Sequence, residues 1–86
     1  MAWSGGGEPS RVLVGHFDDV NSVSFSPDGT LVVTSSRDKD ARVWDARTGR
    51  LVQILRGHFG PVAAASFSPD ARWVVTAGPH SAGLWE

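Results

Sequence analysis

The chain has 86 residues, enough for one small domain and too few for several independent ones. Its eight Lys and Arg residues nearly balance nine Asp and Glu residues, and the two signs are interleaved, which excludes the charged patch typical of nucleic-acid or anionic-membrane binding. The absence of cysteine excludes disulfides and thiolate metal sites, and no apolar run is long enough to span a membrane.

Residues 1–10 form a Gly-rich segment that we expect to be a flexible linker. The run Gly5-Gly6-Gly7 lacks the following lysine and the strand-loop-helix context that a phosphate-binding loop requires. This segment also lacks the basic and apolar regions of a secretory signal, so we expect a cytoplasmic protein.

Beyond this segment, short β-rich runs alternate with turn residues, and no amphipathic stretch is long enough for a helix. The predicted strands occupy residues 11–14, 20–25, 31–36, 41–45, 51–55, 62–67, 73–77 and 82–86. In the turn Ser26-Pro27-Asp28-Gly29, proline fixes φ, aspartate can bond its own backbone and glycine takes the positive φ. The counterpart turn has Ala71 in place of glycine, which costs ~1–2 kcal/mol if φ is positive there.

The two halves of the chain are repeats of each other, offset by 42 residues. Residues 11–36 and 53–78 are identical at 13 of 26 positions. A period of ~40–45 residues, with Gly-His early and Trp-Asp late, is the spacing of a four-stranded propeller blade. We therefore assign residues 11–52 to a first repeat and residues 53–86 to a second repeat that lacks its outer strand. A single eight-stranded sandwich is disfavoured because it would not produce this repetition.

The chain resembles the WD-repeat family over nearly all of residues 11–86. Four motifs carry the resemblance: Gly15-His16, Phe25-Ser26-Pro27-Asp28-Gly29, Thr34-Ser35-Ser36-Arg37-Asp38 and Val43-Trp44-Asp45. The resemblance implies an all-β fold of propeller blades, each made of four antiparallel strands, with two blades per chain. In this family the sequence repeat is staggered relative to the blade, which implies that residues 20–55 form one complete blade and that residues 11–14 and 62–86 belong to split blades.

The resemblance also implies a structural tetrad, in which an indole N–H donates to a hydroxyl and the hydroxyl bonds an imidazole oriented by a carboxylate. In the first repeat the tetrad residues are His16, Thr34, Asp38 and Trp44, with Ser36 as an alternative to Thr34. The second repeat supplies His58, Thr76 and Trp85, and has His80 where the aspartate would stand.

A hydroxyl, a histidine and a carboxylate are also the groups of a hydrolase triad. Triads are recognised by geometry, however, and the sequence has no Gly-x-Ser-x-Gly elbow to expose a nucleophile, so we expect no enzymatic activity. The spacings of His16, His58 and His80 match no common zinc site, so we expect neither a metal nor a cofactor.

The two ends of the sequence are complementary. Residues 7–14 align with residues 49–56, which contain the predicted outer strand at residues 51–55. The second repeat lacks such a strand, and residues 7–14 of another copy can supply it. Uncovered apolar faces and unpaired strand edges promote association, and closed propellers use ~4–8 blades. We therefore expect oligomerisation of copies, head to tail, to complete the ring, as a tetramer with eight blades in preference to a trimer with six.

The predicted function is that of a non-enzymatic interaction scaffold that binds peptides or proteins, with neither nucleic acid nor membrane as a partner. By resemblance, one loop-bearing face binds them, and it is lined by Asp19, Asn21, Arg37, Pro61, Ala63 and Pro79. The alternative is an excised or engineered pair of repeats that self-assembles and has no evolved ligand.

Overall fold

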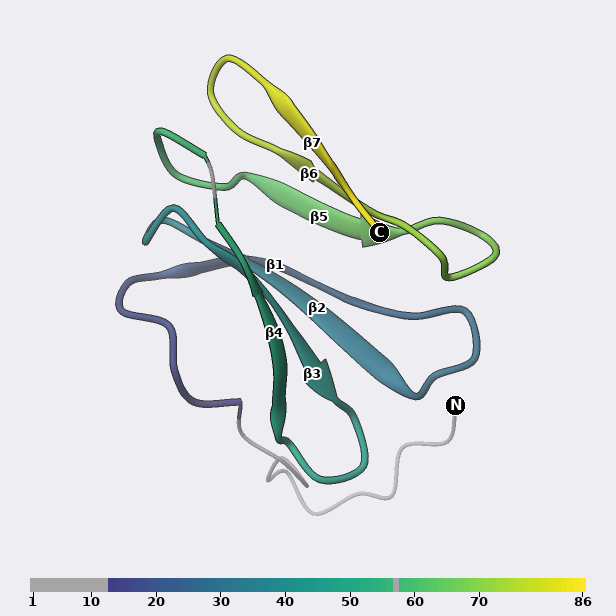
Figure 1. Cartoon of the computed structure of the whole chain (residues 1–86). Helices are drawn as coiled ribbons and strands as arrows, with labels where there is room; N and C mark the ends of the chain where they lie inside the picture. The colour runs from purple at the N-terminus through teal and green to yellow at the C-terminus, as the bar shows by residue number, and fades with distance from the viewer. Residues whose placement is uncertain (1–12, 57) are drawn as a thin grey trace.

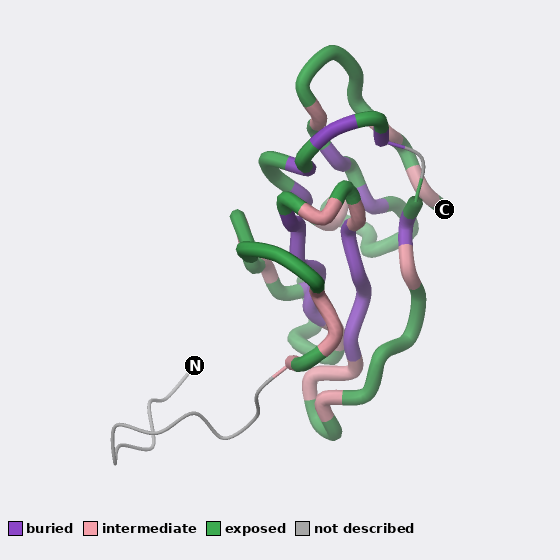
Figure 2. The backbone as a smooth tube through the Cα atoms, turned by 90° about the vertical axis from the view of Figure 1, so that its left-hand side faces the viewer, coloured by how far each residue is buried: buried purple, intermediate pink, exposed green. Residues whose placement is uncertain are grey.

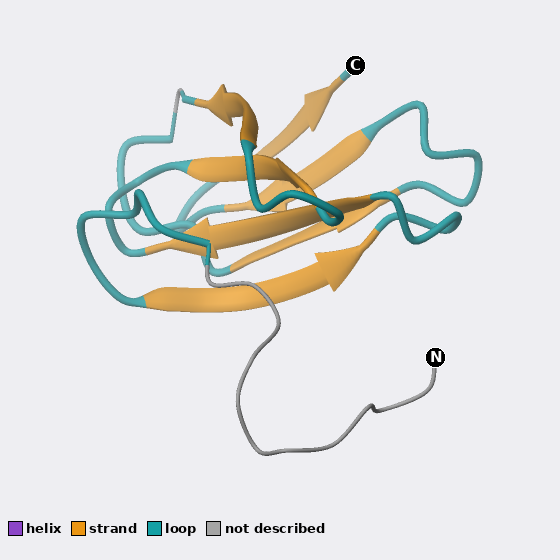
Figure 3. Cartoon of the chain, turned by 90° about the horizontal axis from the view of Figure 1, so that it is seen from below, coloured by secondary structure: helices purple, strands orange, loops and turns teal. Residues whose placement is uncertain are grey.

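The computed structural model of the chain describes residues 13–56 and 58–86, which form seven antiparallel strands in two sheets (Figure 1). The first sheet, blade A, has the order β1 (Val20–Phe25), β2 (Leu31–Ser36), β3 (Ala41–Asp45) and β4 (Leu51–Leu55). The second, blade B, has the order β5 (Ala64–Phe67), β6 (Val74–Ala77) and β7 (Ala82–Trp85). These described residues are strands and loops throughout, so they include no helix that could cross a membrane (Figure 3).

The strands of blade A have the predicted bounds, whereas those of blade B are slightly shorter than predicted. Strand β5 begins at Ala64, and the N–H of Val62, two residues earlier, donates to the carbonyl of Ser36 in blade A at 2.8 Å rather than to β6. Pro61 has no N–H for a ladder. Strand β6 begins at Val74 and β7 ends at Trp85, each one residue inside the predicted range.

The strand predicted at residues 11–14 is wrong for Leu13 and Val14, which are not in a strand. The remainder of that predicted strand and the predicted linker, residues 1–10, lie outside the described residues. Residues 11–14 align in the repeat with β4, an outer strand that pairs with the third strand of its own blade. Within residues 13–56 and 58–86, Leu13 and Val14 have no such partner strand.

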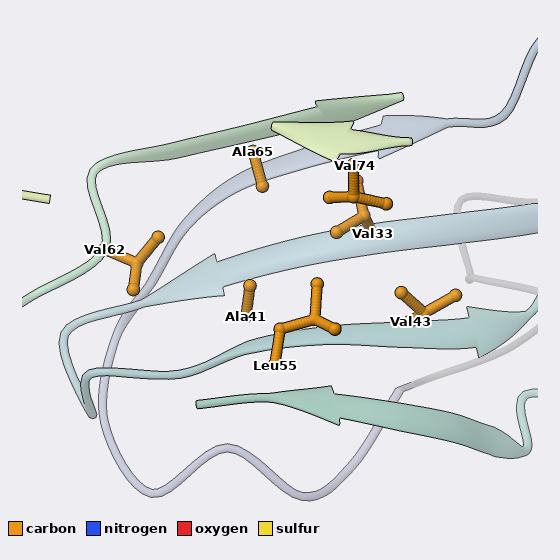
Figure 4. Packing of buried hydrophobic residues seen from close by; sticks show 7 residues of the cluster. All are labelled: Val33, Ala41, Val43, Leu55, Val62, Ala65 and Val74. Carbon is orange, nitrogen blue, oxygen red and sulfur yellow. The ribbon is translucent and has the colours of Figure 1, made fainter. Parts of the chain in front are cut away.

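The two blades lie face to face and share one hydrophobic core (Figure 4). It is formed by Val33, Ala41, Val43 and Leu55 from blade A and by Val62, Ala65 and Val74 from blade B. Since side chains alternate along a strand, β2 directs Val33 toward blade B and Val32 and Thr34 to the outer face of blade A. Both faces of β2 are nevertheless buried, and the longest buried stretches of the trace run through the middle of the molecule (Figure 2).

The turn between the first two strands has the predicted geometry in both blades. Gly29 has a φ of +76°, and Ala71 has a φ of +61° at the equivalent position. Asp28 accepts hydrogen bonds from the Ser26 hydroxyl at 2.7 Å and from the Thr30 N–H at 3.0 Å. Together with a bond from the Thr30 hydroxyl, these lower the pKa of Asp28 from 3.8 to about 2.

Candidate functional site

Four side chains on the outer face of blade A form a continuous hydrogen-bonded chain. The indole N–H of Trp44 donates to Thr34 Oγ1 at 2.8 Å, and Thr34 Oγ1 lies 2.6 Å from His16 Nε2. His16 Nδ1 lies 2.8 Å from Asp38 Oδ2. With the Asp38 carboxylate accepting from Nδ1–H, His16 Nε2 is left to accept the hydroxyl proton of Thr34. The structure thus brings together the four residues that the resemblance had assigned to the tetrad.

Asp38 is held by the loop around it as well as by His16. It accepts from the N–H of Phe17 at 2.9 Å and from the N–H of Asp40 at 3.0 Å. Burial raises the pKa of Asp38, but these two bonds and the bond to His16 lower it more, so its pKa lies below the ordinary value. Asp38 therefore stays ionised and fixes the orientation of the imidazole.

Ser36, the alternative to Thr34, has a different contact. Its hydroxyl accepts from the N–H of Asp38 at 3.1 Å, and it thereby stabilises the loop that carries the carboxylate. In the register of the sheet, Val32 is opposite Trp44 and Thr34 is opposite Arg42, so the indole reaches Thr34 rather than the more distant Ser36.

Blade B forms three members of the same network. Thr76 Oγ1 lies 2.7 Å from His58 Nε2 and accepts from the indole N–H of Trp85 at 2.9 Å. His80, in the position aligned with Asp38, is exposed. Within residues 58–86, no carboxylate is bonded to His58. A side chain at Gly78 would place its Cβ 2.5 Å from His58 Nδ1, so the β6–β7 loop passes close to the imidazole here.

The geometry of these groups differs from that of a hydrolytic site. The Thr34 hydroxyl is buried and already bonded to both Trp44 and His16, which leaves no open position for an attacked carbonyl beside it. Among residues 13–56 and 58–86, no group of three or more His, Cys, Asp or Glu side chains is placed to hold a metal ion. The arrangement can orient and stabilise the loops between strands.

The six residues predicted to line a binding face are all exposed and lie at one end of the two sheets. Four of them lie just before or at the start of β1 or β5: Asp19, Asn21, Pro61 and Ala63. The other two, Arg37 and Pro79, follow β2 and β6. The N–H of Arg37 donates to the carbonyl of Asp19 at 3.0 Å, which joins two of these loops. In Figure 1 the loops before β1 and β5 and the loop after β2 lie on the left, and the loop between β6 and β7 lies above them at the top.

The same end carries a hollow that the sequence did not predict. It has a volume of about 250 Å³ and is lined by Phe59, Gly60, Pro79, His80 and Ser81. Phe59 is 98% exposed, and its repeat counterpart Phe17 is 87% exposed. The only sequence signal was the recurrence of phenylalanine after both Gly-His pairs.

Arg42 is another residue that sequence reasoning missed. It is buried on the outer face of blade A, where its guanidinium carbon lies 5.6 Å from the centre of the Phe17 ring and its Nη2 lies 3.7 Å from Asp40 Oδ2. Its Nε has no hydrogen-bond partner among the described residues. The equivalent position in blade B is Gly83, so the two blades present different groups here.

Comparison with known families identifies this architecture. The chain matches the family described as "WD domain, G-beta repeat" at residues 7–45 and again at residues 49–86. These two matches cover most of its length, and the chain belongs to the WD-repeat family.

Relatives in this family include proteins of several kinds. The chain is 44% identical over 48 residues to ribosome assembly protein 4 of Chaetomium thermophilum, which covers 56% of this chain and 9% of that protein. It is 55% identical over 42 residues to the WD repeat-containing protein SL1-17 of Schistosoma mansoni, covering 49% of this chain and 14% of the relative. It is 50% identical over 44 residues to the guanine nucleotide-binding protein subunit beta of Zea mays, covering 51% of this chain and 12% of that protein. This chain therefore spans only a small part of these relatives.

Proposed function

We propose that the chain is a non-enzymatic WD-repeat scaffold whose copies stack head to tail into a closed propeller and whose loop face binds peptides or proteins. The observation that carries the proposal is a match between exposed and buried faces. Each outward face of the blade pair corresponds in the repeat to a face that is buried between the two blades, and it keeps apolar residues at positions that are buried there.

The outer face of blade B is equivalent to the inner face of blade A. In blade A, the neighbouring residues Val33 and Val43 are 0% and 6% exposed because blade B covers them. Their equivalents Val75 and Leu84 are also paired across two strands, but are 42% and 68% exposed. An apolar surface of this composition favours a further blade as its cover.

The outer face of blade A is correspondingly equivalent to the inner face of blade B. Ala65 and Phe67 of β5 pack into the core between the blades. Their equivalents in β1, Val23 and Phe25, are 62% and 48% exposed. The outer face of blade B in one copy therefore has a matching surface on blade A of the next copy. This is a head-to-tail contact, which closes into a ring when the rotation per copy divides the circle.

The edge of blade B supports the same arrangement. Strand β7 is an edge strand, with only β6 as a neighbour among the described strands. Between the blades on this side lies a cavity of about 150 Å³, whose lining includes Val52 and Leu55 of β4 and Trp85 of β7. In the repeat, residues 7–14 align with residues 49–56, which include β4, so we propose that this segment of a second copy covers the free edge of β7.

Two blades per copy limit the size of the ring. Closed propellers use ~4–8 blades, so a tetramer has eight and a trimer has six. We propose the tetramer. The loop end of each copy would then lie on one side of the ring, with the hollow beside Phe59 repeated around it. The relatives include a ribosome assembly protein and a subunit of a guanine nucleotide-binding protein, and these names support binding to other proteins as the role of the loop face.

The mass of the purified 86-residue chain in solution tests this proposal. Light scattering coupled to size-exclusion chromatography is expected to give about four times the chain mass of 9.2 kDa. A folded species with the mass of one chain at high concentration would contradict self-assembly.

A further inference from the structure

Among the described residues, three hydrogen bonds cross between the blades, and two of them use side chains of β1. The Asn21 amide donates to the carbonyl of Val62 at 2.8 Å, and Ser22 Oγ accepts from the N–H of Ala65 at 3.2 Å. The third bond joins the N–H of Val62 to the carbonyl of Ser36 at 2.8 Å. Ser22 Oγ also lies 2.5 Å from Ser35 Oγ, so a second hydroxyl fixes its orientation.

The equivalent groups are absent from the outer face of blade B. Asn21 corresponds to Ala63, Ser22 to Ala64 and Ser35 to Ala77. Ala64 and Ala77 are paired in the same register as Ser22 and Ser35, and all three alanines are exposed. The three bonds between the blades define the joint between blade A and blade B. The outer face of blade B therefore has the backbone of this joint without its polar side chains. Blade A contributes three groups to these bonds: the Asn21 amide, the Ser22 hydroxyl and the Ser36 carbonyl. Of these, blade B retains only the carbonyl, which belongs to Gly78.

The groups on the other side of the joint are present in both blades. Val20 and Val23 of blade A are equivalent to Val62 and Ala65 of blade B, and their backbone groups have the same positions in the repeat. A second copy stacked on blade B would therefore present the backbone groups of its Val20 and Val23. These groups would meet alanine side chains, which can neither donate nor accept a hydrogen bond. The joint between copies then has one hydrogen bond where the joint inside the chain has three.

We propose that the joint between copies is the weaker of the two, and that the assembly exchanges intact two-blade units. The inference rests on the head-to-tail assembly proposed above. The partner is the outer face of blade A in a second copy, held by apolar contact and one backbone bond. A net hydrogen bond tightens an association by roughly fivefold, so the loss of two weakens the joint by roughly 25-fold relative to the internal one.

The test restores the missing groups in the full chain. In the triple variant A63N/A64S/A77S, the outer face of blade B regains the amide and the hydroxyl pair found in blade A. The dissociation constant of the assembly, measured by sedimentation velocity over a dilution series, is expected to fall by roughly 25-fold for each joint between copies. The rate at which differently labelled copies exchange is expected to fall in parallel.

The matched control is A63L/A64S/A77S, in which leucine has the same branching and number of side-chain heavy atoms as asparagine but cannot donate a hydrogen bond. It is expected to tighten each joint by only roughly fivefold, because one of the two bonds is still missing. Equal tightening by both variants, or none by either, would overturn the proposal of a weaker joint while leaving head-to-tail assembly intact. A wild-type chain that stays a folded monomer would instead contradict the assembly itself. Thermal unfolding of all three proteins checks that each is folded.

Discussion

Gly29 and Ala71 occupy the same position in the turns of the two blades, and both have positive φ, +76° and +61°. Glycine adopts this region without steric cost, whereas the Cβ of alanine meets the neighbouring carbonyl. The rest of the turn is conserved between the blades, since Asp70 accepts from the Ser68 hydroxyl at 2.6 Å as Asp28 does from Ser26. The turn of blade B thus keeps the bonds from the serine hydroxyl and the backbone N–H to the aspartate, but it lacks the bond from the Thr30 hydroxyl and contains a strained residue.

Ala71→Gly is therefore expected to raise the free energy of unfolding by about 1 kcal/mol. Urea denaturation followed by tryptophan fluorescence measures this change. Gly29→Ala is the matched control in the other blade and is expected to lower the stability by a similar amount. No change in either variant would mean that the turns relax to negative φ without loss.

The repeat and its turns allowed most of the fold to be predicted from sequence. Identity at an offset of 42 residues, combined with turn residues at fixed positions, located the strands of blade A and three of blade B. The tetrad side chains could be assigned because the motif itself specifies their spacing. The choice between Thr34 and Ser36 needed the register of β2 and β3, since both residues lie on the same face of one strand.

The contacts between blades could not be predicted in the same way. Asn21 was assigned to the binding face, yet its amide bonds the carbonyl of Val62, 41 residues away. No local pattern marks a partner at that distance along the chain. The burial of Arg42 beneath the Phe17 ring could not be predicted from the sequence either, because a charged residue in a strand is ordinarily exposed to solvent.

The two threonines at the centre of the tetrads provide a second prediction. Thr34→Val removes the acceptor for the Trp44 indole N–H, and Trp44 is only 1% exposed, so the donor is left buried without a partner. The expected loss is about 2 kcal/mol. Thr76→Val is expected to cost less, because Trp85 is partly exposed and water can accept its N–H. Equal losses in urea denaturation would show that burial of the indole does not decide the effect.

Acid is expected to destabilise the chain through the turn carboxylates. The pKa of Asp28 is about 2 in the folded chain against 3.8 ordinarily, and the pKa of Asp70 is also lowered, chiefly by the Ser68 hydroxyl. A lowered folded pKa favours the ionised form in the folded state, so its contribution is present above about pH 4 and is lost as the pH falls toward 2. The melting temperature should therefore fall across this interval.

The double variant D28N/D70N checks the assignment of that acid sensitivity. Asparagine can still accept from the serine hydroxyls but does not titrate in this range. Its melting temperature is expected to fall less steeply than that of the wild type between pH 4 and 2. The remaining slope should include Asp38, whose pKa is lowered as well. An unchanged slope would show that other carboxylates govern acid unfolding.

Partner binding at the loop face is expected to depend on Arg37. This residue is exposed at the end of the sheets where the loops of both blades meet. Arg37→Glu reverses its charge and is expected to change partner recovery in a pull-down by roughly fivefold, as for about 1 kcal/mol at an exposed charge. Arg72→Glu, in the β5–β6 turn, is the control for charge reversal elsewhere on the surface. Equal recovery with both variants would count against this face.

Complementary face variants test the direction of stacking. Phe25→Glu places a carboxylate on the outer face of blade A, and Leu84→Glu places one on the outer face of blade B. Both side chains are exposed in the single chain, so folding and melting temperature should change little. In a stacked assembly either carboxylate would be buried without a partner, which costs several kcal/mol. Light scattering should therefore find each variant alone with the mass of one chain.

Mixed in equal amounts, the two variants are expected to form a heterodimer and nothing larger. The intact blade B face of F25E can bind the intact blade A face of L84E, while the two altered faces stay free. Head-to-tail contacts predict this result because each interface needs one face of each kind. A contact between two like faces would instead let F25E alone dimerise through blade B. A mixture that keeps the mass of one chain would contradict stacking through these faces.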